Sequence, residues 1–164
     1  SILTIPAVNL GVALSVYVGQ NVGAEEYGRT RQGLKDSFKI AAVFTALTMA
    51  ILWFSSPFLM LLVVGNEAAV IPIGVQYLRI ISLTFPLCVS LYLLTNFLRG
   101  AGEIAYPLFN TLLELSFRTI SAFVLAHYFG FAGVLLCRPL SFVVSTVSLS
   151  CRLLSGRWKN KATT

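Results

Sequence analysis

The sequence predicts an all-α integral membrane protein with about five transmembrane helices. Hydrophobic residues make up 57% of the 164 residues and charged residues only 11%, whereas a soluble globular domain carries roughly 25% charged residues. The apolar residues form long blocks, and a helix needs roughly 20 mostly apolar residues to cross a bilayer. Most of the charged residues stand between these blocks. Composition and pattern together nearly exclude a water-soluble protein.

The first two spans are expected at residues 1–22 and 40–64, which contain no Asp, Glu, Lys or Arg. The segment 25–39 between them is expected to form a separate amphipathic helix that lies along the cytoplasmic surface of the membrane. Tyr27, Leu34 and Phe38 fall on one face of such a helix. The alternative is a solvated linker with incidental charge pairs, since exposed pairs contribute little to stability.

The other three spans are expected at residues 73–98, 107–128 and 132–151. A turn at residues 130–133, with a glycine at each end, separates the last two. The uncharged stretch 119–137 is an alternative span, which the glycines inside it disfavour. At about 1.5 Å per residue, residues 107–128 extend about 30 Å, which is the thickness of the hydrocarbon core.

The lysines and arginines predict the orientation, because the cytoplasmic loops of membrane proteins are enriched in them. Three of the 12 cations lie inside the expected spans, and the other nine fall on one side if the spans alternate in direction. These nine are Arg29, Arg31, Lys35, Lys39, Arg99, Arg152, Arg157, Lys159 and Lys161. The C-terminus is therefore expected on the cytoplasmic side.

Two ionisable residues lie on one face of the fourth expected span. An ionised side chain at membrane depth costs roughly 2.5–3.5 kcal/mol on insertion scales, so it usually faces protein or a wet cavity. Glu114 and Arg118 are spaced i, i+4 and can pair with each other. One interpretation is a carboxylate that binds a proton or a cation, which Arg118 releases or opposes. The favoured interpretation is a structural pair, because a pre-paired carboxylate is a poor proton acceptor.

Four further residues inside the spans are candidates for a cavity wall or a hinge, namely Pro86, Arg79, Arg138 and Asn96. Arg79 and Arg138 have no obvious acidic partner, and they either meet across two helices or extend outward to the membrane surface. Pro86 removes a backbone hydrogen bond in mid-membrane, which marks either a substrate path or a structural kink. Asn96 is expected to hydrogen-bond either a neighbouring helix or a substrate, and the packing of helices is the favoured role.

The chain carries few groups suited to catalysis, metal binding or nucleic-acid binding. It has no Ser-His-Asp set and no glycine-rich phosphate loop. The single histidine, His127, has no partner for a metal site. Cys88, Cys137 and Cys151 are expected as free thiols buried among apolar neighbours. The net charge is +6, but the chain has no exposed polar face on which basic residues could bind nucleic acid. We therefore expect no enzyme, no metal, no cofactor and no nucleic-acid partner.

Three short motifs lie at the ends of the expected spans. They are GQNVGA at residues 19–24, RGAGE at residues 99–103 followed by Tyr106 and Pro107, and GFAG at residues 130–133 followed by Pro139. Their order and positions resemble the multidrug and toxic compound extrusion (MATE) family of transporters. The motif residues that carry this resemblance most clearly are Gly19, Gln20, Gly23, Arg99, Gly100, Gly102 and Pro107.

The resemblance covers essentially the whole chain and implies part of the second six-helix lobe of a twelve-helix MATE-type transporter, from the eighth to the twelfth helix. It implies the export of small cationic amphipathic compounds across the inner (plasma) membrane, in exchange for sodium ions or protons. It also implies that the N-terminal lobe of the same protein is missing from this chain. That lobe and membrane lipid are then the partners of this chain. Glu114 and Arg118 resemble an acidic-basic pair of some bacterial members. Around Pro86, where some members carry an aspartate, this sequence has only apolar or small residues.

Two other functions stay open at this point. A lipid-linked oligosaccharide flippase of the same superfamily would require Arg79, Arg118 and Arg138 to converge on a diphosphate. A non-transporting membrane scaffold fragment would require no N-terminal lobe.

Overall fold

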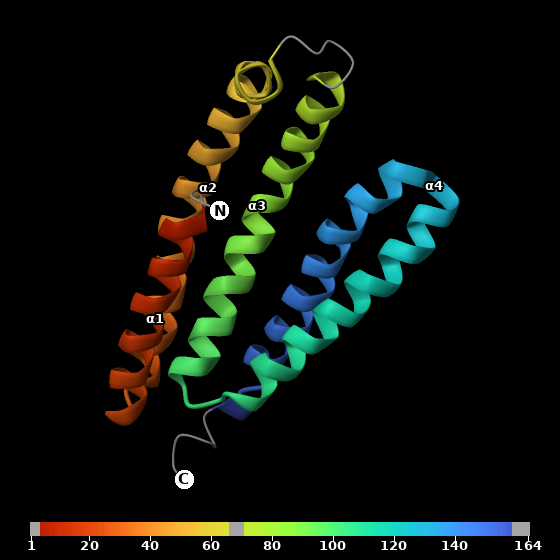
Figure 1. The fold of residues 1–164 in the computed structure, drawn as a ribbon. Coiled ribbons are helices and arrows are strands. Elements are labelled where there is room, and N and C mark those ends of the chain that lie inside the picture. Colours follow the sequence, from red (N-terminus) through yellow and green to blue (C-terminus); the bar gives the residue numbers. More distant parts are fainter. Residues whose placement is uncertain (1–3, 66–70, 159–164) are drawn as a thin grey trace.

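The computed structural model describes residues 4–65 and 71–158 of the chain. In this part of the chain the fold is all-helical, with α1 at Ile5–Gly23, α2 at Tyr27–Val64, α3 at Ile71–Gly100 and α4 at Ala105–Leu154. Helix α3 contacts each of the other three helices. The helices lie side by side as a bundle (Figure 1).

Helix α4 is a hairpin of two antiparallel arms, Ala105–Tyr128 and Gly133–Leu154 (Figure 1). The chain reverses at Gly130, whose backbone angles are φ 58° and ψ −136°. Glycine adopts such a positive φ at little cost because it has no Cβ. The chain thus turns where its glycines predict a turn, and the alternative single span at residues 119–137 is wrong. The two arms and helices α1 to α3 give five helices that are long and apolar enough to cross a membrane, which confirms the predicted number.

Successive helices and arms run in alternating directions, which gathers the basic residues at one end of the bundle (Figure 1). The beginning of α2, the end of α3 and the end of α4 all lie at this end, which we call the basic end. The described basic residues of the predicted cytoplasmic group lie in these segments or, for Arg157, just after α4, namely Arg29, Arg31, Lys35, Lys39, Arg99, Arg152 and Arg157. Lys159 and Lys161 lie outside the described residues.

The separate amphipathic helix expected at residues 25–39 is wrong, because these residues are the first part of α2. The segment is helical from Tyr27, but it continues into the second span without a break. Buried residues spaced three or four apart form one stripe through both segments, namely Thr30, Leu34, Ser37, Ala41, Thr45, Thr48, Leu52 and Ser56. The apolar face of residues 25–39 therefore packs against other helices. Leu34 and Ala41 belong to the hydrophobic core, and Phe38 packs against it.

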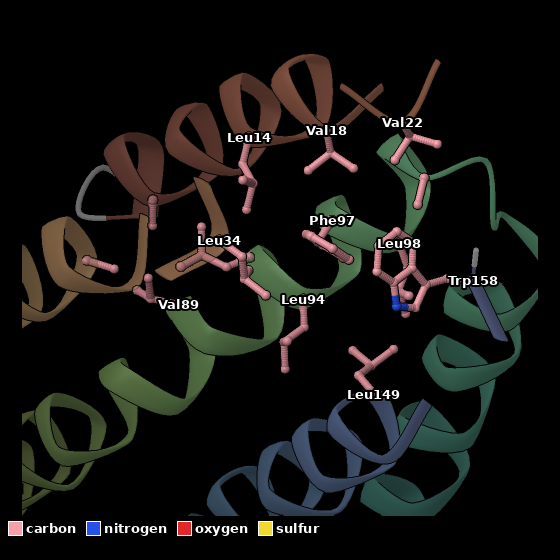
Figure 2. Close-up of a cluster of buried hydrophobic side chains, with 14 of the residues drawn as sticks. Leu14, Val18, Val22, Leu34, Val89, Leu94, Phe97, Leu98, Leu149 and Trp158 are labelled. Carbon is pink, nitrogen blue, oxygen red and sulfur yellow. The ribbon is translucent and has the colours of Figure 1, made fainter. Parts of the chain in front are cut away.

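The core lies toward the basic end, between α1, α2, α3 and the end of α4. Figure 2 shows its side chains, which converge from α1 (Leu14, Val18, Val22), α2 (Leu34), α3 (Val89, Leu94, Phe97, Leu98), α4 (Leu149) and Trp158. Phe97 and Trp158 are almost completely buried and meet edge to face, with ring centroids 5.2 Å apart. The Trp158 Nε1 donates a hydrogen bond to the backbone oxygen of Leu153 over 3.2 Å. The tryptophan thus ties the segment after α4 to the centre of the bundle.

Candidate functional site

A cavity of about 530 Å³ lies between α3 and the two arms of α4. Sites for small molecules typically measure roughly 300–1,000 Å³. Its wall is formed by Thr4, Cys88, Leu91, Tyr92, Thr95, Arg99, Thr111, Glu114, Arg118, Arg138 and Phe142. Four charged side chains thus share one cavity, and three of them, Glu114, Arg118 and Arg138, are candidates from the middle of the spans. We call this space the Glu114 cavity.

Glu114 and Arg118 face each other along the first arm of α4. The Arg118 Nη1 lies 3.7 Å from the Glu114 Oε1. The Arg118 side chain is 40% exposed and the Glu114 side chain is 15% exposed. A charge-assisted hydrogen bond would bring these atoms to about 2.7–2.9 Å. Among the described residues neither side chain makes a hydrogen bond within the usual distance. The predicted pair is therefore present but loose, and both groups keep hydrogen-bonding capacity toward the cavity.

Arg138 enters the same cavity from the second arm of α4. Its guanidinium carbon lies 5.7 Å from the ring centroid of Phe142, a cation–π contact. No acidic side chain of the described residues comes within 4.0 Å of it. Arg118 and Arg138 also line a second, smaller cavity of about 190 Å³. The hairpin thus places two guanidinium groups from opposite arms beside the same space.

Arg79 lies elsewhere, and it does not line the Glu114 cavity. Its guanidinium carbon lies 5.1 Å from the ring centroid of Trp53 on α2. Of the two alternatives for Arg79, the one in which it meets Arg138 across two helices is therefore wrong. The same placement contradicts the flippase alternative, which requires Arg79 to converge with Arg118 and Arg138.

Pro86 and Asn96 also lie outside the wall of the Glu114 cavity. Pro86 lines a separate cavity of about 130 Å³ between α2 and α3. The Asn96 Nδ2 donates a hydrogen bond to the backbone oxygen of Tyr92 over 2.9 Å, within its own helix. Asn96 does pack against α1, where a Cβ on Gly11 would come within 2.7 Å of the Nδ2. The predicted packing role is present, but the predicted hydrogen bond to a neighbouring helix is wrong.

Two of the motif glycines bring α1 and α3 into backbone contact. A Cβ on Gly100 would overlap the backbone carbonyl of Ser15, and a Cβ on Gly19 would come within 3.3 Å of the Gly100 oxygen. Close approach through small residues is typical of helix packing in membranes. These motif positions are therefore required for packing at the basic end, whereas Arg99 lines the Glu114 cavity.

A buried ion pair at the basic end was not predicted from the sequence. Glu103 is completely buried, and its Oε1 accepts hydrogen bonds from the Nε of Arg152, over 2.7 Å, and from its Nη2. The Arg152 guanidinium carbon also lies 4.9 Å from the ring centroid of Tyr106. Glu103 lies just before α4 and Arg152 lies in its last turn, so the turn predicted at Gly130 is the signal in the sequence that brings the two ends of the hairpin together.

The cysteines differ in environment. Cys88 and Cys137 are buried free thiols, as expected, and Cys88 lines the Glu114 cavity. Cys151 is exposed, so the expectation of burial is wrong there. A hydrophobic stretch has a face that points away from the bundle, and Cys151 lies on that face of α4.

Comparisons with known proteins agree with this architecture. The sequence model of the MatE family matches residues 1–124. The probable multidrug resistance proteins YoeA and YpnP of Bacillus subtilis (strain 168) are 26% and 27% identical to the chain. Their alignments cover 100% and 97% of the chain but only 36% of each relative. The chain therefore spans about a third of the length of these relatives.

A solved structure has the same fold. It is the inward-facing conformation of a multidrug resistance MATE family transporter of the MOP superfamily, with a TM-score of 0.78 and 17% identity. The match covers 90% of this chain and 36% of that one. The family match extends over most of the chain, and the fold agrees with it. The chain belongs to the MATE family.

Proposed function

We propose that the chain forms part of a secondary active transporter that exports cationic amphipathic compounds in exchange for sodium ions or protons. The MATE family consists of transporters rather than enzymes, and the proposal includes no catalytic activity. The observation that carries it is the Glu114 cavity, which has the volume of a small-molecule site and a carboxylate at membrane depth.

The proposal includes a second lobe as partner, because the chain spans only 36% of the length of its relatives. That lobe would form the opposite wall of the cavity, and alternating access would move the two lobes against each other. Membrane lipid would cover the outer faces, such as the exposed side of α2 at Val43, Leu47 and Ile51. We call the natural polypeptide that contains these 164 residues the full-length protein.

In this proposal Glu114 binds the coupling ion and Arg118 responds to its release. A sodium ion or proton on Glu114 neutralises the carboxylate, and the nearby guanidinium stabilises the ionised form once the ion leaves. The 3.7 Å separation is loose enough for an ion to compete with Arg118. A cation that moves inward gains about 2.3 kcal/mol per 100 mV of membrane potential.

Replacing Glu114 by glutamine is expected to reduce the export of a cationic dye by about tenfold or more, because the amide cannot be ionised and binds cations weakly. The measurement is ethidium efflux from cells that lack other efflux pumps, at matched levels of the full-length protein. Glu25→Gln is the control, because Glu25 is exposed in the turn between α1 and α2. Unchanged efflux for Glu114→Gln at normal expression would contradict the role of Glu114.

We also propose that the protein is a multi-pass protein of the inner (plasma) membrane with its C-terminus in the cytoplasm. The clustering of basic residues at one end of the bundle supports this orientation. Green fluorescent protein fused after Thr164 is expected to fluoresce, and alkaline phosphatase fused at the same position is expected to be inactive. Active phosphatase at that position would reverse the proposed orientation.

A further inference from the structure

The first turns of α2 carry two basic residues that no acid compensates. The charged residues of this helix are Arg29, Arg31, Lys35, Asp36 and Lys39, and its one acid, Asp36, pairs with Lys39 over 2.8 Å. Arg31 and Lys35 are exposed, and within the described residues neither of them forms an ion pair or a hydrogen bond. The two cations lie one turn apart on the same face of α2.

The helices packed against α2 add no acid to this face. Helix α1 has no charged residue, and the charged residues of α3 are Arg79 and Arg99. Glu25 and Glu26 precede α2, and Glu26 lies about 7.5 Å along the axis from Arg31, on the side away from the membrane span. Arg31 and Lys35 therefore form a positively charged patch.

An apolar cavity of about 130 Å³ lies between α2 and α3, directly beyond this patch. Phe38 and Ala42 line it from α2, and Pro86 and Val89 line it from α3. Phe38 and Ala42 follow Lys35 by three and seven residues, so they continue the same face of the helix. The two hydroxyl groups in the wall donate hydrogen bonds within their own helices, which leaves the wall apolar. Ala42 is exposed, so the cavity opens to the surface of the bundle.

The patch and the cavity lie at two successive levels of a membrane. The uncharged part of α2 begins at Ile40, and Lys35 lies about 7.5 Å from it along the helix. The headgroup layer on each side of the hydrocarbon core is about 5–8 Å thick. Lys35 thus lies at the outer edge of the headgroups, whereas Ala42 lies at the level of the acyl chains.

We propose that Arg31 and Lys35 bind the phosphate of an anionic phospholipid, one acyl chain of which occupies the cavity between α2 and α3. The planar fork of a guanidinium matches two phosphate oxygens, and a lysine one turn away adds a compact positive charge. A zwitterionic lipid carries its own cation beside the phosphate, so it binds this patch more weakly. The site lies outside the Glu114 cavity, and it does not depend on the proposed transport function.

The experiment compares dioleoyl phosphatidylglycerol, which is anionic, with dioleoyl phosphatidylcholine, which has the same acyl chains and no net charge. Native mass spectrometry of the purified full-length protein in detergent counts the bound lipids and gives their dissociation constants. The wild type is expected to bind the first phosphatidylglycerol about tenfold more tightly than phosphatidylcholine. Arg31→Gln combined with Lys35→Gln is expected to remove this preference. Ala42→Leu, which fills the cavity, is expected to weaken the binding of both lipids.

Arg29→Gln combined with Arg157→Gln is the matched control, because it also removes two exposed cations from the basic end. Arg29 lies about 160° away from Arg31 around the helix, and the control is expected to keep the preference. An equal loss in the two double variants would assign the preference to net charge and overturn the site, as would a wild-type protein that binds both lipids equally. Displacement of the lipid by glycerol 3-phosphate at the same concentration would assign the patch to free phosphate compounds and overturn the lipid site.

Discussion

Replacing Arg152 by methionine is expected to lower the unfolding free energy of the full-length protein by about 3–5 kcal/mol, because a buried charge then loses its partner. Glu103 is completely buried, and Arg152 supplies the hydrogen bonds to its Oε1. Its Oε2 has no hydrogen-bond partner among the described residues. The measurement is the melting temperature of the purified protein in detergent, which is expected to fall by about 5–10 °C.

Lys39→Met is the matched control for this variant, since it also removes a cation from an ion pair. The Lys39 Nζ lies 2.8 Å from the Asp36 Oδ1, but the two side chains are 73% and 49% exposed. Exposed pairs contribute about 0–1 kcal/mol, so the melting temperature is expected to change little. The two variants are thus expected to differ in stability because the Glu103 pair is buried and the Asp36 pair is exposed, although both sites contain an ion pair.

A double variant identifies the cause of the expected loss. Exchanging a buried ion pair for apolar residues of similar volume is often neutral, so Glu103→Leu is expected to restore much of the stability lost in Arg152→Met. A double variant as unstable as the single one would instead assign the loss to the missing contact between Arg152 and Tyr106. An Arg152→Met protein that melts like the wild type would contradict the burial of Glu103.

The number of helices and the hairpin turn could be predicted from the sequence, because both depend on local patterns. Long apolar blocks and the glycines at 130 and 133 are visible without any knowledge of contacts. The first part of α2 could not be assigned correctly, because an amphipathic segment has the same periodicity whether lipid or protein covers its apolar face. Only the neighbouring helices show that Leu34 is buried in protein.

The candidate site was predictable where its residues are neighbours on one helix. Glu114 and Arg118 are one turn apart, so their contact follows from the spacing alone. Arg138 joins them only because the hairpin brings the second arm alongside, and Arg79 is held away by Trp53 on a different helix. The number of arginines within the spans can be read from the sequence, but which of them line the same cavity depends on contacts between helices.

Replacing Gly100 by alanine is expected to destabilise the full-length protein by about 1–3 kcal/mol, because one added methyl group has no space. The new Cβ would overlap the backbone of Ser15 on α1, so no side-chain rotation can relieve the contact. The helices α1 and α3 would have to separate, and the burial of Leu14 and Val18 between them would decrease. The measurement is again the melting temperature in detergent. Gly28→Ala is the control, because nothing lies within 4 Å of its Cβ position.

The comparison with Gly11 tests whether the backbone contact is the cause. A Cβ on Gly11 would meet the terminal amide of Asn96, a side chain that can move, so Gly11→Ala is expected to cost less than Gly100→Ala. Adding Asn96→Ala to Gly11→Ala is expected to restore the stability that Gly11→Ala loses. Adding Ser15→Gly to Gly100→Ala is expected to recover nothing, because the overlapping atoms at Ser15 belong to the backbone. If Gly100→Ala melts like Gly28→Ala, the two helices are not in backbone contact, and the motif glycines need another explanation.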